Sequence, residues 1–256
     1  MTLAMRNLLL TSALALLVAT TAGLAPTSSR AEAAPSNDPA ESQISKEPGD
    51  PSLPVYKPPP KAKYPRARVG GITRGSLGKD PMVVALVPDH VAETFRPQPT
   101  LYWYISQTTT LPIIFTLRED EAVRPALETP LAPPRKPGIQ VIRLKDFGVE
   151  LKETITYRWF VSVQRDHESP SQDIVTGGMI ERVPYSDLLV LCPGFTDRDP
   201  FTLARCGLWY DALRVISEKI DESPQDLMPH RQRAALLKQV GLHEIAELDL
   251  KPDIKP

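Results

Sequence analysis

The sequence predicts a mainly β protein with a helical C-terminal part: an antiparallel, immunoglobulin-like β-sandwich and a helical hairpin that packs on it. Three observations lead to this prediction. Residues 81–183 contain a series of segments whose alternating or continuous apolar residues are typical of strands. No helical pattern separates these segments, which disfavours parallel β–α–β construction and favours a sandwich. After Pro184 the apolar residues recur every three or four positions, which indicates helix.

Residues 1–33 are typical of a secretory signal peptide. Arg6 precedes the apolar run 8–18, and small residues then lead to Ala31-Glu-Ala33, a motif for signal-peptide cleavage. The apolar run of roughly 11 residues is shorter than the 20 or so that span a bilayer. We therefore expect cleavage near Ala33 and a periplasmic or secreted mature chain without a transmembrane segment. An uncleaved membrane anchor is the alternative.

Residues 34–68 are predicted to form a proline-rich disordered linker. The chain has 28 prolines, and many of them fall between Pro35 and Pro65 among small polar and charged residues. A segment of this composition cannot bury enough apolar surface to offset the entropy lost on ordering. The folded part is therefore expected to begin near residue 69.

Residues 69–185 are predicted to form the β-sandwich. The clearest strand covers 155–163, and 82–87 is continuously apolar, as expected for a strand buried on both faces. The proline- and charge-rich segment 119–137 is expected to be a loop. In the clearest strand, one face is formed by Ile155, Tyr157, Trp159, Val161 and Val163.

Two tyrosines of one predicted strand are candidates for a binding surface. Tyr102 and Tyr104 alternate with Trp103, so they lie on the opposite face of that strand. If this face is open, its aromatic stripe marks a recognition surface, and Trp209 of the helical part is a third candidate. The alternative is that the C-terminal helices cover the tyrosines, which would also bury the apolar face of the hairpin.

Residues 186–256 are predicted to form the helical hairpin. Asp199 is a suitable N-cap, and the apolar stripe 203–220 follows it, with a further helix expected around 236–240. Within the stripe, Gly207–Leu213 resembles the second half of a tetratricopeptide unit. One hairpin cannot bury its own apolar face, so we expect it to pack on the sandwich or on a partner.

The chain contains two cysteines, Cys192 and Cys206. Disulfides persist in the oxidising environment outside the cytoplasm, and this spacing would close a loop that stabilises the fold by about 3 kcal/mol. The alternative is a pair of buried thiols, because Cys206 falls on the apolar stripe of the predicted helix. Both states are kept as hypotheses.

Several short motifs of the predicted strands and helices occur together in one known family. They are Trp103-Tyr104, Tyr157-Arg-Trp159, Pro170-Ser171, Glu181-Arg-Val183 and Gly207–Leu213. This set resembles the bacterial family called domain of unknown function 928. The resemblance extends from residue 68 to residue 250 and implies an exported bacterial protein. It implies no catalytic residue, because none is established for the family.

The segment 166–173 is the densest polar cluster of the chain. Asp166, His167 and Asp173 are residue types found in metal sites and in Ser-His-Asp triads, and His90 is a further possible metal ligand. A triad needs its three groups in series, which one short loop between strands rarely supplies. Turn-forming residues are expected there in any case. We therefore predict no cofactor and no catalytic residue, with a metal site at these residues as the alternative.

The overall charge and the motifs together favour a binding function. A formal net charge of −1 argues against a nucleic-acid-binding protein, which would normally carry a strongly basic domain. Export, the sandwich with its hairpin, and the lack of a convergent acid–base set predict a non-enzymatic binding or assembly module whose partner is another envelope protein. One alternative is a metal-assisted hydrolase centred on the Asp166–Asp173 loop. The other is a structural subunit of an envelope complex.

Overall fold

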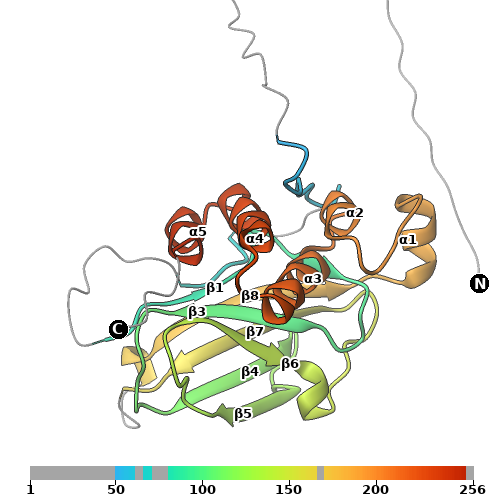
Figure 1. The fold of residues 1–256 in the computed structure, drawn as a ribbon. Helices are drawn as coiled ribbons and strands as arrows, with labels where there is room; N and C mark the ends of the chain where they lie inside the picture. The colour runs from blue at the N-terminus through green and yellow to red at the C-terminus, as the bar shows by residue number, and fades with distance from the viewer. Residues whose placement is uncertain (1–49, 61–65, 71–79, 166–169, 252–256) are drawn as a thin grey trace, which may run out of the picture. The chain divides into compact units, whose positions relative to one another are not determined.

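The computed structural model describes residues 50–60, 66–70, 80–165 and 170–251 of the 256-residue chain. These residues form a mixture of strands and helices, with two sheets and a C-terminal helical region (Figure 1). The predicted signal peptide, residues 1–33, lies outside the described residues. Within the described part of the chain, no helix combines the length and apolar character needed to cross a membrane.

The smaller sheet has three antiparallel strands in the order β1-β3-β6. β3 is its central strand and is buried on both faces from Leu101 to Ile105. The continuously apolar segment predicted as a doubly buried strand forms β1, and all three residues of β1 are buried. The three strands are β1 (Val83–Ala85), β3 (Thr100–Ile105) and β6 (Gly138–Arg143), and the short 3-10 helix η1 (Leu144–Phe147) follows β6.

The larger sheet has five strands in the order β2-β8-β7-β4-β5. β7 confirms the strand predicted around 155–163, because its residues alternate strictly between buried and half-buried positions. The five strands are β2 (Ala92–Thr94), β8 (Ile174–Arg182), β7 (Thr156–Val163), β4 (Ile113–Glu119) and β5 (Leu127–Leu131), and the 3-10 helix η2 (Pro170–Gln172) precedes β8.

Two strands of the larger sheet differ from the sequence prediction. β5 lies within the segment 119–137, which was expected to be a loop. It is an edge strand, where Pro130 costs no ladder hydrogen bond. β2 has only three residues, too few to show a period, and it pairs parallel to β8. The predicted immunoglobulin-like antiparallel sandwich is therefore not confirmed; two sheets of three and five strands are what the structure contains.

The C-terminal region contains five helices in the described residues instead of a single hairpin. The stripe 203–220 is divided because Gly207 adopts a left-handed φ of 83°, which ends one helix and lets the next begin at Trp209. Asp199 caps the second helix as predicted and accepts hydrogen bonds from the backbone N–H groups of Phe201 and Thr202. The helices are α1 (Tyr185–Leu191), α2 (Pro200–Arg205), α3 (Trp209–Glu222), α4 (Leu227–Gln239) and α5 (His243–Asp249).

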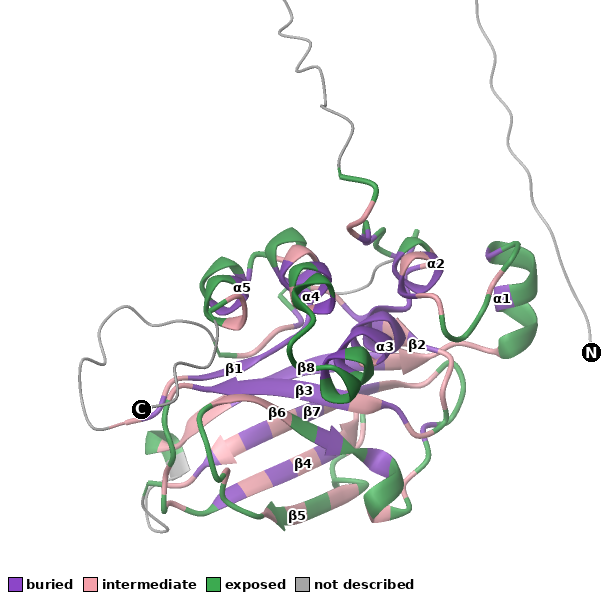
Figure 2. Ribbon diagram, in the orientation of Figure 1, coloured by how far each residue is buried: buried purple, intermediate pink, exposed green. Residues whose placement is uncertain are grey.

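Helix α3 connects the helical region to both sheets. It packs against β2 and β3. The Trp209 indole N–H donates a 2.9 Å hydrogen bond to the Leu86 carbonyl oxygen. The Tyr210 hydroxyl accepts a 3.0 Å hydrogen bond from the indole N–H of Trp159 and donates one of 3.0 Å to the Met179 carbonyl oxygen. These buried polar groups are thus satisfied, and they fix the orientation of α3 on the sheets. Figure 2 shows the N-terminal part of α3 in the colour of buried residues.

The described part of the predicted linker packs on the fold, which corrects the prediction for these residues. Pro54, Tyr56 and Pro59 are buried. Val69 exchanges two backbone hydrogen bonds of 3.0 Å with Gly177 of β8. Composition predicted disorder because the segment has few apolar residues of its own. The segment is buried because it packs against a surface formed by other parts of the chain. Residues 34–49 and 61–65 lie outside the described residues.

Candidate functional site

Helix α1 carries a group of exposed apolar side chains, which we call the α1 surface. The exposed fractions are 54% for Tyr185, 59% for Leu189, 78% for Val190 and 75% for Leu191. Leu188 alone among the α1 residues is buried. Figure 2 shows most of α1 in the colour of exposed residues. Exposed apolar surface of this kind marks interaction sites on folded proteins.

The helix exposes these residues because of its sequence pattern. The run Leu188-Leu-Val-Leu191 places apolar side chains on successive positions, and these point in different directions around a helix. Only one direction can face the rest of the chain. This helix was not predicted from the sequence, because a seven-residue element is too short to show a 3.6-residue period. The uninterrupted apolar run 188–191, which begins four residues after Pro184, was the signal available.

Two sets of contacts hold α1 at its ends. Cys192 at its C-terminal end forms a disulfide with Cys206 at the end of α2, with the two Cα atoms 5.8 Å apart. At the other end, the Tyr185 ring meets the Phe195 ring edge-on at 6.0 Å, and Phe195 meets Phe95 in the same way at 5.1 Å. The α1 surface is therefore presented by an anchored helix.

A buried carboxyl group lies where α3 meets the chain after β2. The Asp211 side chain is 1% exposed, and it accepts a 3.1 Å hydrogen bond from the backbone N–H of Phe95. Its other oxygen lies 3.4 Å from Nε of Arg96, which also reaches Asp197 at 3.6 Å. Burial raises the pKa of Asp211 to about 6, although a hydrogen bond from Thr94 and the nearby arginines act in the opposite direction.

The three aromatic candidates of the sequence analysis lie in the core. Tyr102, Tyr104 and Trp209 are all buried. Tyr102 is hydrogen-bonded to Ser217 of α3, and burial raises the pKa of Tyr102 to about 12. The helices cover the face that carries both tyrosines, which was the alternative to an open aromatic stripe. As surface-exposed binding residues these candidates are corrected: their rings serve packing.

The polar loop proposed as a metal or catalytic site falls mainly outside the described residues, because Asp166 and His167 are among those not described. Asp173 is half-buried and accepts a 3.3 Å hydrogen bond from the backbone N–H of Arg165. His90, the proposed additional ligand, is hydrogen-bonded through Nε2 to the Tyr56 hydroxyl at 2.9 Å. Among the residues that the structure describes, no three His, Cys, Asp or Glu side chains gather to form a metal site.

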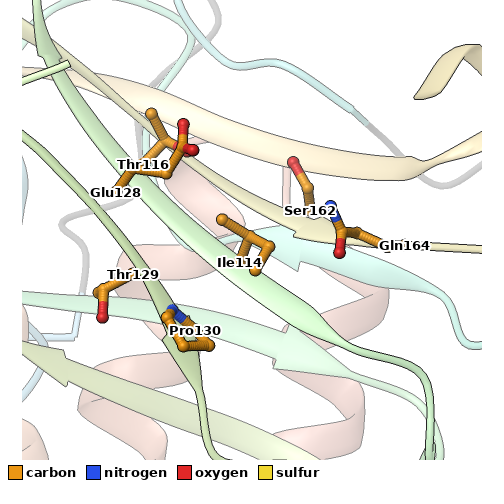
Figure 3. Close-up of a pocket in the computed structure, with 7 residues that line it drawn as sticks. All are labelled: Ile114, Thr116, Glu128, Thr129, Pro130, Ser162 and Gln164. Carbon is orange, nitrogen blue, oxygen red and sulfur yellow. The ribbon is translucent and has the colours of Figure 1, made fainter. Parts of the chain in front are cut away.

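The outer face of the five-stranded sheet has a shallow hollow of about 300 Å³ between β4, β5 and β7 (Figure 3). Glu128 is the one ionisable side chain among its seven lining residues, and Ser162 has no histidine beside it in that lining. Glu128 lies opposite Thr116 in the β4–β5 ladder, so the lining holds hydroxyls and one carboxylate but neither a histidine nor a cysteine. The lining residues are Ile114, Thr116, Glu128, Thr129, Pro130, Ser162 and Gln164.

A second hollow of about 470 Å³ lies at one end of the same sheet and is acidic. Its Glu119 is paired with Lys152 at 2.7 Å, and its Asp120 is paired with Arg158. These carboxylates are already neutralised by neighbouring cations. The remaining lining residues are Glu121, Ala122, Thr154, Ile155 and Thr156.

The family model described as Domain of Unknown Function (DUF928) matches residues 69–250. The matched range contains both sheets and all five C-terminal helices, so it includes the α1 surface and its disulfide. The comparison with curated proteins found no match.

Proposed function

The chain belongs to the DUF928 family, and from this premise we propose that it is a non-enzymatic interaction module that acts outside the cytoplasm, in the bacterial envelope. Its partner is another envelope protein, one with an apolar groove that receives helix α1. The single observation that carries the proposal is the α1 surface: four large apolar side chains exposed on an anchored helix.

The chemistry of α1 favours a protein partner over a lipid surface. Helices that lie on membranes combine an apolar face with a polar face rich in lysine and arginine. Asp187 is the one charged residue of α1, and it is acidic. Tyr185 and Leu189 are four positions apart and therefore neighbours on one helix face, which is the spacing used by helices that dock into apolar grooves.

The disulfide supports a location outside the cytoplasm. Disulfides form and persist in oxidising compartments and are rare where thiols are kept reduced. The signal-like pattern of residues 1–33 points to the same compartment. The two features are independent, since one is an N-terminal sequence pattern and the other is a cross-link near the helices.

The two surface hollows give the metal-assisted hydrolase alternative no support, because neither lining contains a histidine or a cysteine and no three His, Cys, Asp or Glu side chains of the described residues gather as a metal site. Asp166 and His167 of the proposed catalytic loop lie outside the described residues. The binding proposal, in contrast, is carried by residues whose exposure is described.

Site-specific photo-crosslinking in the native cells tests the proposal. A photoreactive residue is placed at Val190 of the full chain, and a matched control carries it at Val123, which is 94% exposed in the loop between β4 and β5. We expect one reproducible protein adduct from position 190, absent from position 123. The same adducts from both positions, or none from 190, would contradict the proposal.

A charge substitution links the adduct to the apolar surface. Leu189→Asp in the Val190 crosslinking background should remove most of the adduct, because docking would then bury an unpaired carboxylate. The chain should remain folded, since residue 189 is mainly exposed in the free protein. An undiminished adduct in a folded L189D variant would show that the α1 surface does not carry the contact.

A further inference from the structure

Residues 50–60, which we call the strap, lie across the helical region at α2, α3 and α4 (Figure 1). Pro54, Tyr56 and Pro59 are buried there, while Val55 between the first two is 58% exposed. The strap therefore turns selected side chains inward. We call the surface beneath it the docking face; it consists of Ala204, Gly207, Trp209, Gln232 and Gln239.

The docking face binds the backbone of the strap through four hydrogen bonds. The Gln239 side chain contributes two of them: its Nε2 donates to the Pro54 carbonyl oxygen at 2.9 Å, and its Oε1 accepts from the Tyr56 N–H at 2.8 Å. Gln232 Nε2 donates to the Ser52 carbonyl oxygen at 3.2 Å. The Lys57 N–H donates to a backbone carbonyl oxygen of α2, that of Ala204, at 3.1 Å.

One aromatic side chain anchors the strap. The Tyr56 ring meets the Trp209 ring edge-on, with centroids 5.0 Å apart, and its hydroxyl is hydrogen-bonded to Nε2 of His90 at 2.9 Å. The anchor thus has both an apolar contact and a polar partner, as a buried tyrosine requires.

The docking face also has the shape to admit prolines. A Cβ atom at Gly207 would lie 3.2 Å from Cγ of Pro59 and 3.3 Å from the Lys57 carbonyl oxygen. The glycine is therefore needed twice, for its left-handed φ of 83° and for the close approach of the strap. Any side chain at this position would press against the strap.

These contacts have the form of peptide recognition. Side-chain amides that pair with an extended backbone, one buried aromatic anchor and closely packed prolines are the means by which proteins bind proline-containing segments. None of these contacts requires the strap to be covalently joined to the docking face. Proline also restricts the free segment, so less entropy is lost on binding.

We propose that the docking face is a recognition site for extended protein segments of the pattern Pro-x-Tyr-x-x-Pro, and that the strap is such a ligand attached in cis. The strap meets this pattern through Pro54, Tyr56 and Pro59. The site uses no residue of the α1 surface, so it goes beyond the function proposed above. A ligand in trans competes with a strap whose effective concentration is on the order of millimolar.

Binding of a labelled peptide to the full chain tests the proposal. The peptide has the sequence of residues 50–60, and the protein carries Tyr56→Asp, which weakens the strap and leaves the docking face unaltered. We expect the peptide to bind the Y56D chain and to bind the wild-type chain at least about tenfold more weakly, because the wild-type strap occupies the site. Failure to bind a folded Y56D chain, or equal binding to both proteins, would overturn the proposal.

Matched variants locate the binding. Adding Gln239→Ala to the Y56D chain removes two hydrogen bonds and should weaken peptide binding about tenfold or more. In the peptide, replacing the tyrosine by aspartate should abolish binding, whereas the same replacement of the exposed valine should leave it nearly unchanged. Equal effects of the two peptide changes would place the contact elsewhere.

A second measurement applies if the Y56D chain does not fold. Gln239→Ala in an otherwise unaltered chain removes the acceptor of the Tyr56 N–H. The Tyr56 amide hydrogen should then exchange with solvent about tenfold faster or more, as expected when a peptide loses a hydrogen bond that holds it to its site. An unchanged exchange rate would show that Gln239 does not hold the strap.

Discussion

Helices α1 and α3 are both rich in apolar residues, yet they meet different surroundings. In α3, nine of 14 residues are buried, and its two N-terminal aromatics donate hydrogen bonds to Leu86, which follows β1, and to Met179 of β8. In α1, one of seven residues is buried. The comparison shows that apolar composition does not decide which helix belongs to the core. The decision depends on which surfaces the rest of the chain supplies, so α3 serves stability while α1 is available for a partner.

One identical substitution in each helix should give the largest difference between them. Leu213→Ala in α3 should lower the free energy of unfolding by about 2–5 kcal/mol, because a fully buried side chain leaves a cavity. Leu191→Ala in α1 should change it by no more than about 0.5 kcal/mol, because this side chain is already in solvent. Urea unfolding of the wild type and of both variants measures the two changes in the free energy of unfolding. Similar losses would mean that α1 is part of the core.

Removal of the disulfide should have the next largest effect and should act on α1 specifically. Changing Cys192 and Cys206 together to serine should lower the free energy of unfolding by about 3 kcal/mol, since the closed loop restricts the unfolded chain. Hydrogen exchange should rise in α1 and remain low in the N-terminal half of α3. Two reactive thiols in the unfolded, unreduced wild-type protein would show that the bond is not formed.

The smallest predicted effect concerns the pH dependence of α3 packing. The pKa of Asp211 is about 6 in the folded chain, above its ordinary value of 3.8. Between pH 3.8 and pH 6 the folded state binds more protons than the unfolded state. The contribution of Asp211 to the free energy of unfolding is therefore largest below pH 4 and is lost as the pH rises through 6. In the Asp211→Asn variant this contribution does not change with pH, because asparagine does not titrate. The stability of the wild type relative to D211N should therefore fall between pH 4 and pH 7, by on the order of 2 kcal/mol.

Urea unfolding of both proteins at intervals between pH 4 and pH 7 measures this change. Other carboxyl groups titrate in both proteins, so their contributions cancel in the difference. A difference that stays constant across the range would mean that the folded state does not raise the pKa of Asp211.

The sequence predicted those parts of the fold whose signal is local. The alternation in β7, the apolar run of β1 and the N-cap at Asp199 each occupy a few consecutive residues, and the structure confirms all three. The family resemblance is confirmed by the match to residues 69–250. Elements too short to show a period, such as β2 and α1, were missed.

The candidate site was predicted less well, because exposure is not a local property. Tyr102 and Tyr104 were selected by a correct strand pattern, but the strand has helices on the face that they occupy. The strap was predicted to be part of a disordered linker because its segment is rich in proline and poor in apolar residues. Its burial depends on Gln239 and Trp209, which are more than 150 residues away in the chain.

By itself, the sequence determined the strands that have a clear apolar pattern, such as β1 and β7, the helix period after Pro184, the cap at Asp199 and the family, because these follow from the order of neighbouring residues. The tertiary structure alone decided that β2 runs parallel to β8, that the strap is held by the docking face, and that α1 remains exposed while α3 is buried. The physical reason is that burial is a property of pairs of surfaces. A sequence pattern shows which face of a helix or strand is apolar, and the tertiary structure decides whether another part of the chain covers that face.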